Sequence, residues 1–129
     1  MKAYIIPHPS LRPMSGGRYR TVGAWCIDTP YGSICVPAGT VTDGASIPRV
    51  LWRVCGSPWD SPRIIAAVAH DYLYATHDYP RQRCDEIYRD MQIALGISPW
   101  RAWLEYHALR LCGGKAWRKA RRTNEARAC

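Results

Sequence analysis

The stretch AAVAHDYLYATHDYPRQRCDEIYRD, residues 66–90, decides the fold. On both sides of HDYP (77–80), apolar residues recur three and four positions apart, which is the spacing of one face of a helix. Proline is well tolerated in the first turn of a helix, so Pro80 marks where the second helix begins. We therefore expect two helices joined by a short turn, an antiparallel helical hairpin.

The same kind of punctuation extends the helical part over residues 61–112. The first helix should begin at Ser61 and end near Thr76, and Gly96 should end the second. A third helix is expected from the Ser98–Pro99 pair to the two glycines at 113 and 114. Six of its residues share one face and are predicted to face the core: Trp100, Trp103, Leu104, His107, Ala108 and Leu111.

Residues 1–48 have the pattern of strands and turns. The tetrapeptide TPYG (29–32) separates WCID from SICV and predicts a hairpin, because it places Pro and Gly where a turn uses them. A short strand is expected in KAYII (2–6), stopped by PHPSLRP, and another through residues 40–42. The chain is thus predicted to be one α+β domain over 1–129, with a small N-terminal antiparallel β region packed on a C-terminal bundle of three to four helices.

The net charge of +8 is unevenly distributed. From Arg110 onward there are seven Lys or Arg residues against one Glu, so residues 113–129 form a basic helix or tail. The longest apolar run, 64–69, is far too short to span a membrane. No signal-peptide core precedes the proline at position 7. These features predict a soluble protein made in a cytoplasm, without a transmembrane segment.

The six cysteines have no CxxC spacing, so a zinc ribbon is not expected. In a reducing cytoplasm they are predicted to be small buried hydrophobic residues. The alternative is one disulfide, because Cys26 and Cys35 are equally distant from the turn at Pro30 and Tyr31 and would face each other across the hairpin.

The helical hairpin places chemically active residues opposite each other. Residues whose numbers sum to about 155 lie at the same level, so His70 should face Asp85 and Tyr74 should face Arg81. A carboxylate bonded to an imidazole fixes its tautomer and orientation, which is what a general base requires. Asp71 points about 100° away from His70 around the helix.

Asp71 could face the TDGASIP loop (42–48), where Asp43 and backbone carbonyls would complete an oxygen-rich site. Oxygen ligands of this kind suit a divalent cation, and calcium in particular. The alternatives are structural. His70 and Asp85 can fix the register of the hairpin, with Arg81 and Arg89 at i−4 and i+4 of Asp85 forming a salt-bridge ladder, and Asp43 before a glycine is typical of a turn.

Several pieces between Thr42 and Trp117 together resemble the phage-associated domain-of-unknown-function family 1353. They are TDGASIPR (42–49), AHDYLY (69–74), RxxCDEIYRDM (81–91), and the closing Tyr106, Arg110, Gly114 and Trp117. The resemblance implies a protein encoded by a phage or prophage.

HDYLY (70–74) also resembles the HDxxY helix motif of secreted phospholipases A-two. This resemblance implies that His70 is the base that activates water, Asp71 a calcium ligand, Tyr74 a hydrogen-bonding partner and Asp85 the orienting carboxylate. The glycine- and cysteine-rich calcium loop of that family is missing here, and Leu73 stands where one of its cysteines would be. The His-Asp doublet is similar to that of HD-type metal phosphohydrolases as well, but their further upstream His could only be His8.

Two functions are therefore hypothesised. The first is a phage-encoded metal-dependent hydrolase acting on a bacterial envelope component, phospholipid or peptidoglycan. The second is a non-enzymatic virion protein of the tail or baseplate, or an assembly partner, in which the His/Asp cluster only stabilises the fold. The basic tail could meet other virion subunits or an anionic surface, whereas sequence-specific nucleic-acid binding is not expected, since no recognition motif accompanies the charge. Its basic residues are Lys115, Arg118, Lys119, Arg121 and Arg122.

Overall fold

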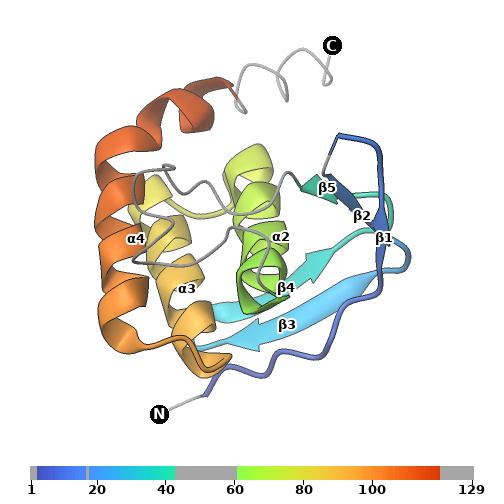
Figure 1. The fold of residues 1–129 in the computed structure, drawn as a ribbon, viewed down its shortest axis with the longest axis horizontal. Helices are drawn as coiled ribbons and strands as arrows, with labels where there is room; N and C mark the ends of the chain where they lie inside the picture. Colours follow the sequence, from blue (N-terminus) through green and yellow to red (C-terminus); the bar gives the residue numbers. More distant parts are fainter. Residues whose placement is uncertain (1–2, 17, 43–60, 120–129) are drawn as a thin grey trace.

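Three helices lie side by side in a computed structural model of the chain, and two small sheets cover one side of them (Figure 1). The structure describes residues 3–16, 18–42 and 61–119. The helices are α2 (Ser61–Thr76), α3 (Arg81–Ala94) and α4 (Pro99–Cys112). The predicted bounds of all three are confirmed to within two residues, as is the α+β class.

The turn between α2 and α3 is tight. His77 closes α2 by donating its backbone N–H to the Leu73 carbonyl, and its φ of 56° is in the left-handed region. This conformation reverses the chain in three residues before Pro80 leads into α3. The helices consequently pack antiparallel, with the register that the sequence predicts.

The strands are β1 (Leu11–Pro13), β2 (Tyr19–Thr21), β3 (Trp25–Thr29), β4 (Gly32–Val36) and β5 (Val41–Thr42). They form a three-stranded sheet in the order β1-β2-β5 and a separate β3-β4 hairpin, all antiparallel. The hairpin and the strand near residues 40–42 are confirmed. The prediction of a strand in KAYII is wrong, because among its described residues Ile5 forms only an isolated bridge, to Asp28. β1 lies instead within PHPSLRP, the segment that was expected to stop that strand. Pro13 is tolerated there because β1 is an edge strand.

The hydrophobic core lies between the β3-β4 hairpin and the helices. Alternate hairpin residues point inward, and the α2 residues 64–69 pack behind them. This apolar stretch of α2 is buried throughout, and its helical length and flanks distinguish it from a buried strand. The inward hairpin residues are Trp25, Ile27, Ile34 and Val36.

The face of α4 that packs on the core differs from the predicted one. Its buried residues are Ala102, Glu105, Tyr106 and Leu109, while Trp100, Trp103, His107 and Leu111 are exposed, and Leu104 and Ala108 are half-buried. The predicted core-facing stripe is therefore wrong. The prediction treated the two tryptophans as core, but the helix instead buries Glu105, which is paired with an arginine of α2.

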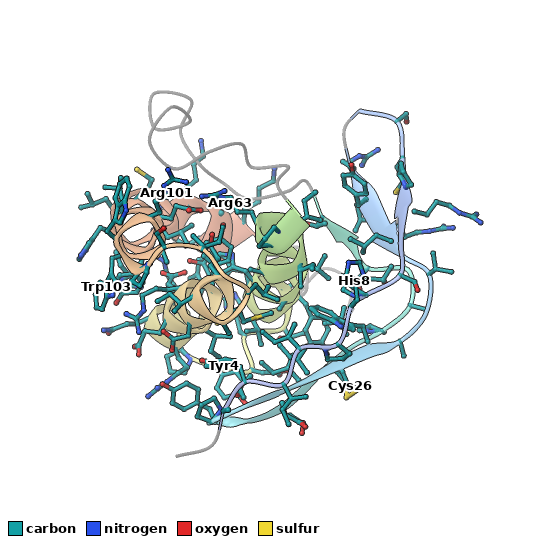
Figure 2. The ribbon with its side chains drawn as sticks, turned by 60° about the horizontal axis from the view of Figure 1, so that its bottom comes forward. Tyr4, His8, Cys26, Arg63, Arg101 and Trp103 are labelled. Atoms are coloured by element: carbon teal, nitrogen blue, oxygen red, sulfur yellow. A yellow bond between two sulfur atoms is a disulfide. The ribbon has the colours of Figure 1, made fainter. Side chains whose placement is uncertain are left out.

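The prediction of reduced, buried cysteines holds for only one described cysteine. Cys84 is buried, whereas Cys112 is exposed. Cys26 and Cys35 pair directly across β3-β4 and form a disulfide on the exposed side of the hairpin (Figure 2). The alternative prediction of a Cys26–Cys35 disulfide, based on their equal distance from the turn, is therefore confirmed. Cys55 and Cys129 lie outside the described residues. Among the described helices, none combines the length and apolar character needed to cross a bilayer.

Candidate functional site

The buried carboxylate of Asp85 joins all three helices. Asp85 on α3 is 0% exposed. Its Oδ1 accepts hydrogen bonds from His70 Nε2 (2.9 Å) and the Tyr74 hydroxyl (2.6 Å), both on α2. Its Oδ2 accepts one from a guanidinium N–H of Arg110 on α4 at 3.0 Å. The structure thus brings together the three predicted catalytic residues, His70, Asp85 and Tyr74.

Arg81 supports the cluster from its edge. Its Nε donates to the Tyr74 hydroxyl at 3.3 Å, as the hairpin register predicted, and lies 4.0 Å from Asp85 Oδ2. A terminal N–H₂ of the same guanidinium donates to the backbone carbonyls of Leu109 and Arg110 at the end of α4. A cation at the C-terminal end of a helix is favourable, because the last carbonyls carry partial negative charge.

The predicted salt-bridge ladder is only half present. Arg81 approaches Asp85, but Arg89 pairs with Asp90 at 2.9 Å instead. Arg110 takes the place of Arg89 as a partner of Asp85. In the sequence, Arg110 was indicated only as one of the residues that resemble family 1353. Arg110 lies one helix away, so no spacing within α3 could have indicated it.

The hydrogen bonds determine the protonation of the pair. Burial alone would raise the pKa of Asp85, but the hydrogen bonds from His70 and Tyr74 and the nearby Arg110 outweigh it and hold the pKa below its usual value. An ionised carboxylate only accepts, so His70 must carry its proton on Nε2. With its proton on Nε2, a neutral imidazole would present Nδ1 as a lone-pair acceptor, which is the form that a general base needs.

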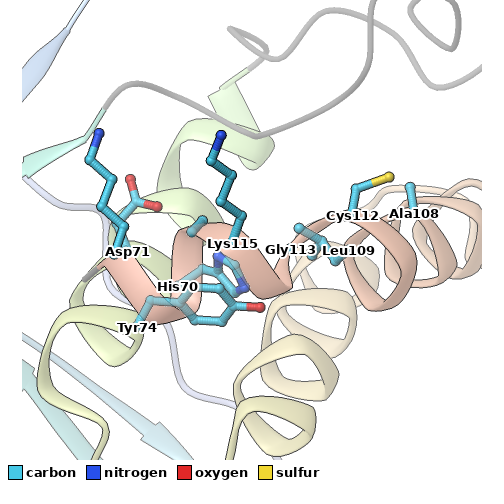
Figure 3. Close-up of a pocket in the computed structure, with 10 residues that line it drawn as sticks. His70, Asp71, Tyr74, Ala108, Leu109, Cys112, Gly113 and Lys115 are labelled. Atoms are coloured by element: carbon cyan, nitrogen blue, oxygen red, sulfur yellow. The ribbon is translucent and has the colours of Figure 1, made fainter. Parts of the chain in front are cut away.

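His70 and Tyr74 also form one wall of a pocket of about 420 Å³ (Figure 3). The opposite wall comes from the end of α4 and the helical residues 114–119 that follow it. No described residue bonds to Nδ1 of His70, so this nitrogen is available to a molecule in the pocket. The pocket is lined by His70, Asp71, Tyr74, Ala108, Leu109, Cys112, Gly113, Lys115, Ala116 and Lys119.

Gly113 allows the two walls to meet. A Cβ at this position would lie 2.6 Å from the Leu109 carbonyl oxygen and 3.1 Å from both the Arg81 guanidinium and the Tyr74 hydroxyl. Only a residue without a side chain fits there. The sequence pattern predicts Gly113 only as the end of a helix and carries no signal of this close approach.

Asp71, a predicted metal ligand, lies in the same pocket. Its Oδ2 accepts a hydrogen bond from the Thr42 hydroxyl at 2.6 Å, which ties α2 to β5. The other predicted ligand, Asp43, lies outside the described residues. Calcium takes six to eight oxygen ligands, and in the described part of the chain no three His, Cys, Asp or Glu residues gather as a metal site.

The described donors therefore do not fit a calcium ion by themselves. Lys115 and Lys119 line the same pocket, and their positive charge opposes a cation. The calcium site remains a prediction that depends on Asp43.

The first part of the basic tail packs against the hairpin turn. Trp117 stacks on the His77 ring, with ring centroids 3.4 Å apart, and meets the Tyr74 ring edge-on at 5.1 Å. His77 Nε2 also lies 3.2 Å from the Trp117 carbonyl oxygen. These contacts hold Lys115 and Lys119 at the pocket, while Arg118 is exposed and Arg121 and Arg122 lie outside the described residues.

Two proteins of Sinorhizobium fredii (strain NBRC 101917 / NGR234) are similar to the chain. One, "Uncharacterized protein y4jT", is 37% identical over 83 residues, which cover 60% of this chain and 23% of the relative. The other, "Uncharacterized protein y4iH", is 37% identical over 70 residues, which cover 54% of this chain and 29% of the relative. The chain therefore matches less than a third of the length of each relative. No solved structure matches it significantly.

A family model described as "Protein of unknown function (DUF1353)" matches residues 21–109. The match includes β3 to β5, the helical hairpin and most of α4, and with them His70, Asp85 and Tyr74. Arg110, Gly114 and Trp117, which also suggested the resemblance, lie beyond it. Since the match covers more than half of the 129 residues, the chain belongs to the DUF1353 family.

Proposed function

We propose that the protein is a phage-encoded hydrolase that uses His70 as its general base. The observation that carries the proposal is the hydrogen bond from His70 Nε2 to the buried, ionised Asp85. His70 lies in the wall of a pocket, and no described residue bonds to its Nδ1. Tyr74 donates to the same carboxylate and keeps it from rotating. The arrangement matches the roles that the HDxxY resemblance implies for these three residues.

The proposed reaction is the hydrolysis of an ester. A water molecule held at Nδ1 gives its proton to His70 as its oxygen attacks the ester carbonyl carbon. The tetrahedral intermediate then collapses, and the leaving alkoxide takes that proton back from Nδ1. Lys115 and Lys119 line the pocket and would stabilise the negative charge that develops on the carbonyl oxygen.

The pocket suits an amphipathic, anionic substrate. Ala108, Leu109 and Ala116 provide an apolar wall, and the two lysines provide positive charge. A phospholipid of the bacterial envelope has both properties. Peptidoglycan is the second envelope substrate to be assayed, and there the same attack of water would be on an amide carbonyl, with the amine as the leaving group.

The test compares the turnover of wild type with that of His70→Ala on phosphatidylglycerol vesicles and on peptidoglycan. General-base catalysis contributes about 10²–10⁴-fold, so we expect a loss of this size in a variant that still unfolds cooperatively. His107→Ala is the matched control, because His107 is exposed on α4 and lines no part of the pocket. Equal turnover in His70→Ala, or none in wild type, would refute the proposal.

The part played by a cation is tested separately. A ligand that binds only the folded state raises stability by about 2.7 kcal/mol at a hundredfold excess over Kd. A rise in Tm with Ca²⁺ over EDTA that disappears in Asp71→Asn would support a metal site at Asp71 and Asp43. The absence of any rise would leave the lysines as the source of positive charge in the pocket.

A second candidate function is a virion structural or assembly protein. It is favoured by the saturation of Asp85, which accepts bonds from two other helices and is flanked by two arginines. Such a cluster fixes the helices whether or not any reaction takes place. Co-purification of the protein with phage particles, with unchanged incorporation of His70→Ala, would favour this candidate.

A further inference from the structure

The exposed apolar side chains of the helical part gather on α4. Trp100 is 56% exposed, Trp103 45% and Leu111 86%. Figure 2 shows Trp103 on the outer side of the helices, away from the β3-β4 hairpin. Side chains of this size at the surface of a small domain mark an interaction site rather than ordinary surface variation when they share one helix face.

The exposed charges of α4 and of the residues that follow it, 114–119, all have one sign, while Arg89 on α3 is paired with Asp90. Between residues 99 and 119 the sole acidic residue is Glu105, and it is buried in a salt bridge with Arg63. The exposed basic residues of this segment are Arg101, Lys115, Arg118 and Lys119.

Two of the exposed rings carry a cation directly. The Arg89 guanidinium lies 4.2 Å from the centre of the Trp103 ring, and that of Arg101 lies 5.3 Å from the centre of the Trp100 ring. The outer face of α4 therefore combines exposed indole rings, a leucine and positive charge.

This combination identifies the partner. The exposed charges of α4 and of residues 114–119 are basic, so this surface complements the negative charge of anionic lipid headgroups. Indole rings settle at the headgroup level of a bilayer, and the basic residues that follow α4, Lys115, Arg118 and Lys119, would add attraction to anionic lipid. We propose that the outer face of α4, defined by Trp100, Trp103 and Leu111, docks on an anionic lipid bilayer.

Docking in this way would bring the pocket to the lipid. Ala108 and Cys112 line the pocket and lie on the turns of α4 next to Leu111, and Lys115 and Lys119 continue the same wall. A lipid headgroup would then need to move only a short distance from the bilayer to His70. Only this last step rests on the proposed hydrolase function, because the docking surface is defined independently of it.

The test is flotation with vesicles of phosphatidylcholine alone and of phosphatidylcholine mixed with phosphatidylglycerol. We expect binding to the mixed vesicles that weakens as salt rises from 0.1 M to 1 M, where the screening length falls from about 10 Å to about 3 Å. The double variant Trp100→Ser/Leu111→Ser should bind at least tenfold more weakly, given that each side chain loses its transfer from water to lipid.

The matched control is Ile5→Ser/Val22→Ser, which removes two apolar side chains that are 63% and 55% exposed on the β part. It should bind like wild type. No binding to mixed vesicles, equal loss in both double variants, or salt-insensitive binding to neutral vesicles would overturn the proposal. Concentration-dependent self-association that is lost in Trp100→Ser/Leu111→Ser, without vesicle binding, would overturn it in favour of a protein partner.

The same assay separates this inference from the hydrolase proposal. His70→Ala leaves the outer face of α4 intact, so it should float with mixed vesicles like wild type whether or not it hydrolyses lipid. Vesicle binding without turnover in wild type would support the docking surface and refute the hydrolase.

Discussion

Two buried carboxylates hold the helices together, and they differ in what lies next to them. Glu105 on α4 accepts from Arg63 Nε at 3.1 Å and from the Tyr88 hydroxyl at 3.1 Å, and the Gln92 amide, with its nitrogen toward the carboxylate, lies 3.2 Å from both oxygens. Asp85 has the same kinds of partner, a tyrosine and arginines, from the same three helices. Only the Asp85 cluster contains a histidine.

The surroundings of the two clusters also differ. Arg63, Tyr88, Gln92 and Glu105 are all at most 3% exposed, and none of them lines a described pocket. His70 and Tyr74 of the other cluster form a pocket wall. The Glu105 cluster is what a purely structural arrangement looks like in this fold, and the Asp85 cluster contains the same arrangement with a base and a pocket added.

The largest expected effect is on stability, and it should be similar in both clusters. Removing one partner of a buried ion pair leaves an uncompensated charge and costs about 3–5 kcal/mol. We expect losses of this size in the free energy of unfolding for Asp85→Ala and Glu105→Ala, measured by urea denaturation. A loss below 1 kcal/mol in either variant would show that the corresponding cluster does not hold the helices.

The two tyrosines provide a matched pair that separates stability from function. Tyr74→Phe and Tyr88→Phe each remove one hydrogen bond to a carboxylate, which contributes about 1.5–3 kcal/mol. Both variants should lose stability by this amount, but only Tyr74→Phe should lower the hydrolysis rate. Equal rates in the two variants would remove the functional difference between the clusters.

The contact between the Asp85 cluster and the end of α4 is tested at Gly113. Gly113→Ala places a methyl group against the Leu109 carbonyl and the Tyr74 hydroxyl, and overpacking of this kind costs about 1–3 kcal/mol. Thermal unfolding should report the loss. Gly23→Ala is the control, since nothing beyond its chain neighbours lies within 4 Å of a Cβ at that position, and it should unfold like wild type.

The two carboxylates should respond to acid in opposite ways. The pKa of Asp85 is held below its ordinary value of 3.8, so its stabilising effect is present above that pH and is lost as the pH falls through the folded pKa. Burial raises the pKa of Glu105 above its ordinary value of 4.5 in spite of its partners, so its contribution is fully present below pH 4.5 and is lost as the pH rises through the folded pKa.

Urea denaturation between neutral pH and pH 3 measures this difference. Asp85→Asn should flatten the loss of stability on the acid side, and Glu105→Gln should steepen it. The same change of slope in both variants would contradict the assignment.

The smallest effect concerns access to the pocket and involves almost no change in stability. Cys112 is exposed at the pocket wall, whereas burial raises the pKa of the Cys84 thiol to about 12. In a Cys55→Ser/Cys129→Ser background, a maleimide should modify Cys112 rapidly and leave Cys84 unmodified until the chain unfolds. Modified protein should lose turnover but keep its Tm, and retained turnover would argue against this pocket as the site.

The helical hairpin and its four facing residues could be predicted from the sequence because a short turn fixes their register. His70, Tyr74, Arg81 and Asp85 are all within a few turns of Pro80, so the geometry of α2 and α3 alone places them. No comparable constraint places α4. Its rotation depends on the pairing of Glu105 with Arg63, more than forty residues away, and this pairing turns Trp100 and Trp103 outward.

The same limitation explains why Arg110 and Gly113 were missed as parts of the site. Both reach the site only because α4 docks there. In the sequence, Arg110 looks like an ordinary basic residue and Gly113 like a glycine that ends a helix. The metal prediction had a different difficulty. It joined Asp71 to a loop whose distance from α2 no sequence period determines.

The sharing of Asp85 among three helices has a consequence for the order of folding. The α2–α3 hairpin is local in sequence and can form early. Its buried carboxylate has its full set of partners only when Arg110 arrives on α4, about 25 residues later in the chain. We therefore expect the two-helix hairpin to be unstable as an intermediate, so that during synthesis the chain commits to its native state only after α4 has left the ribosome.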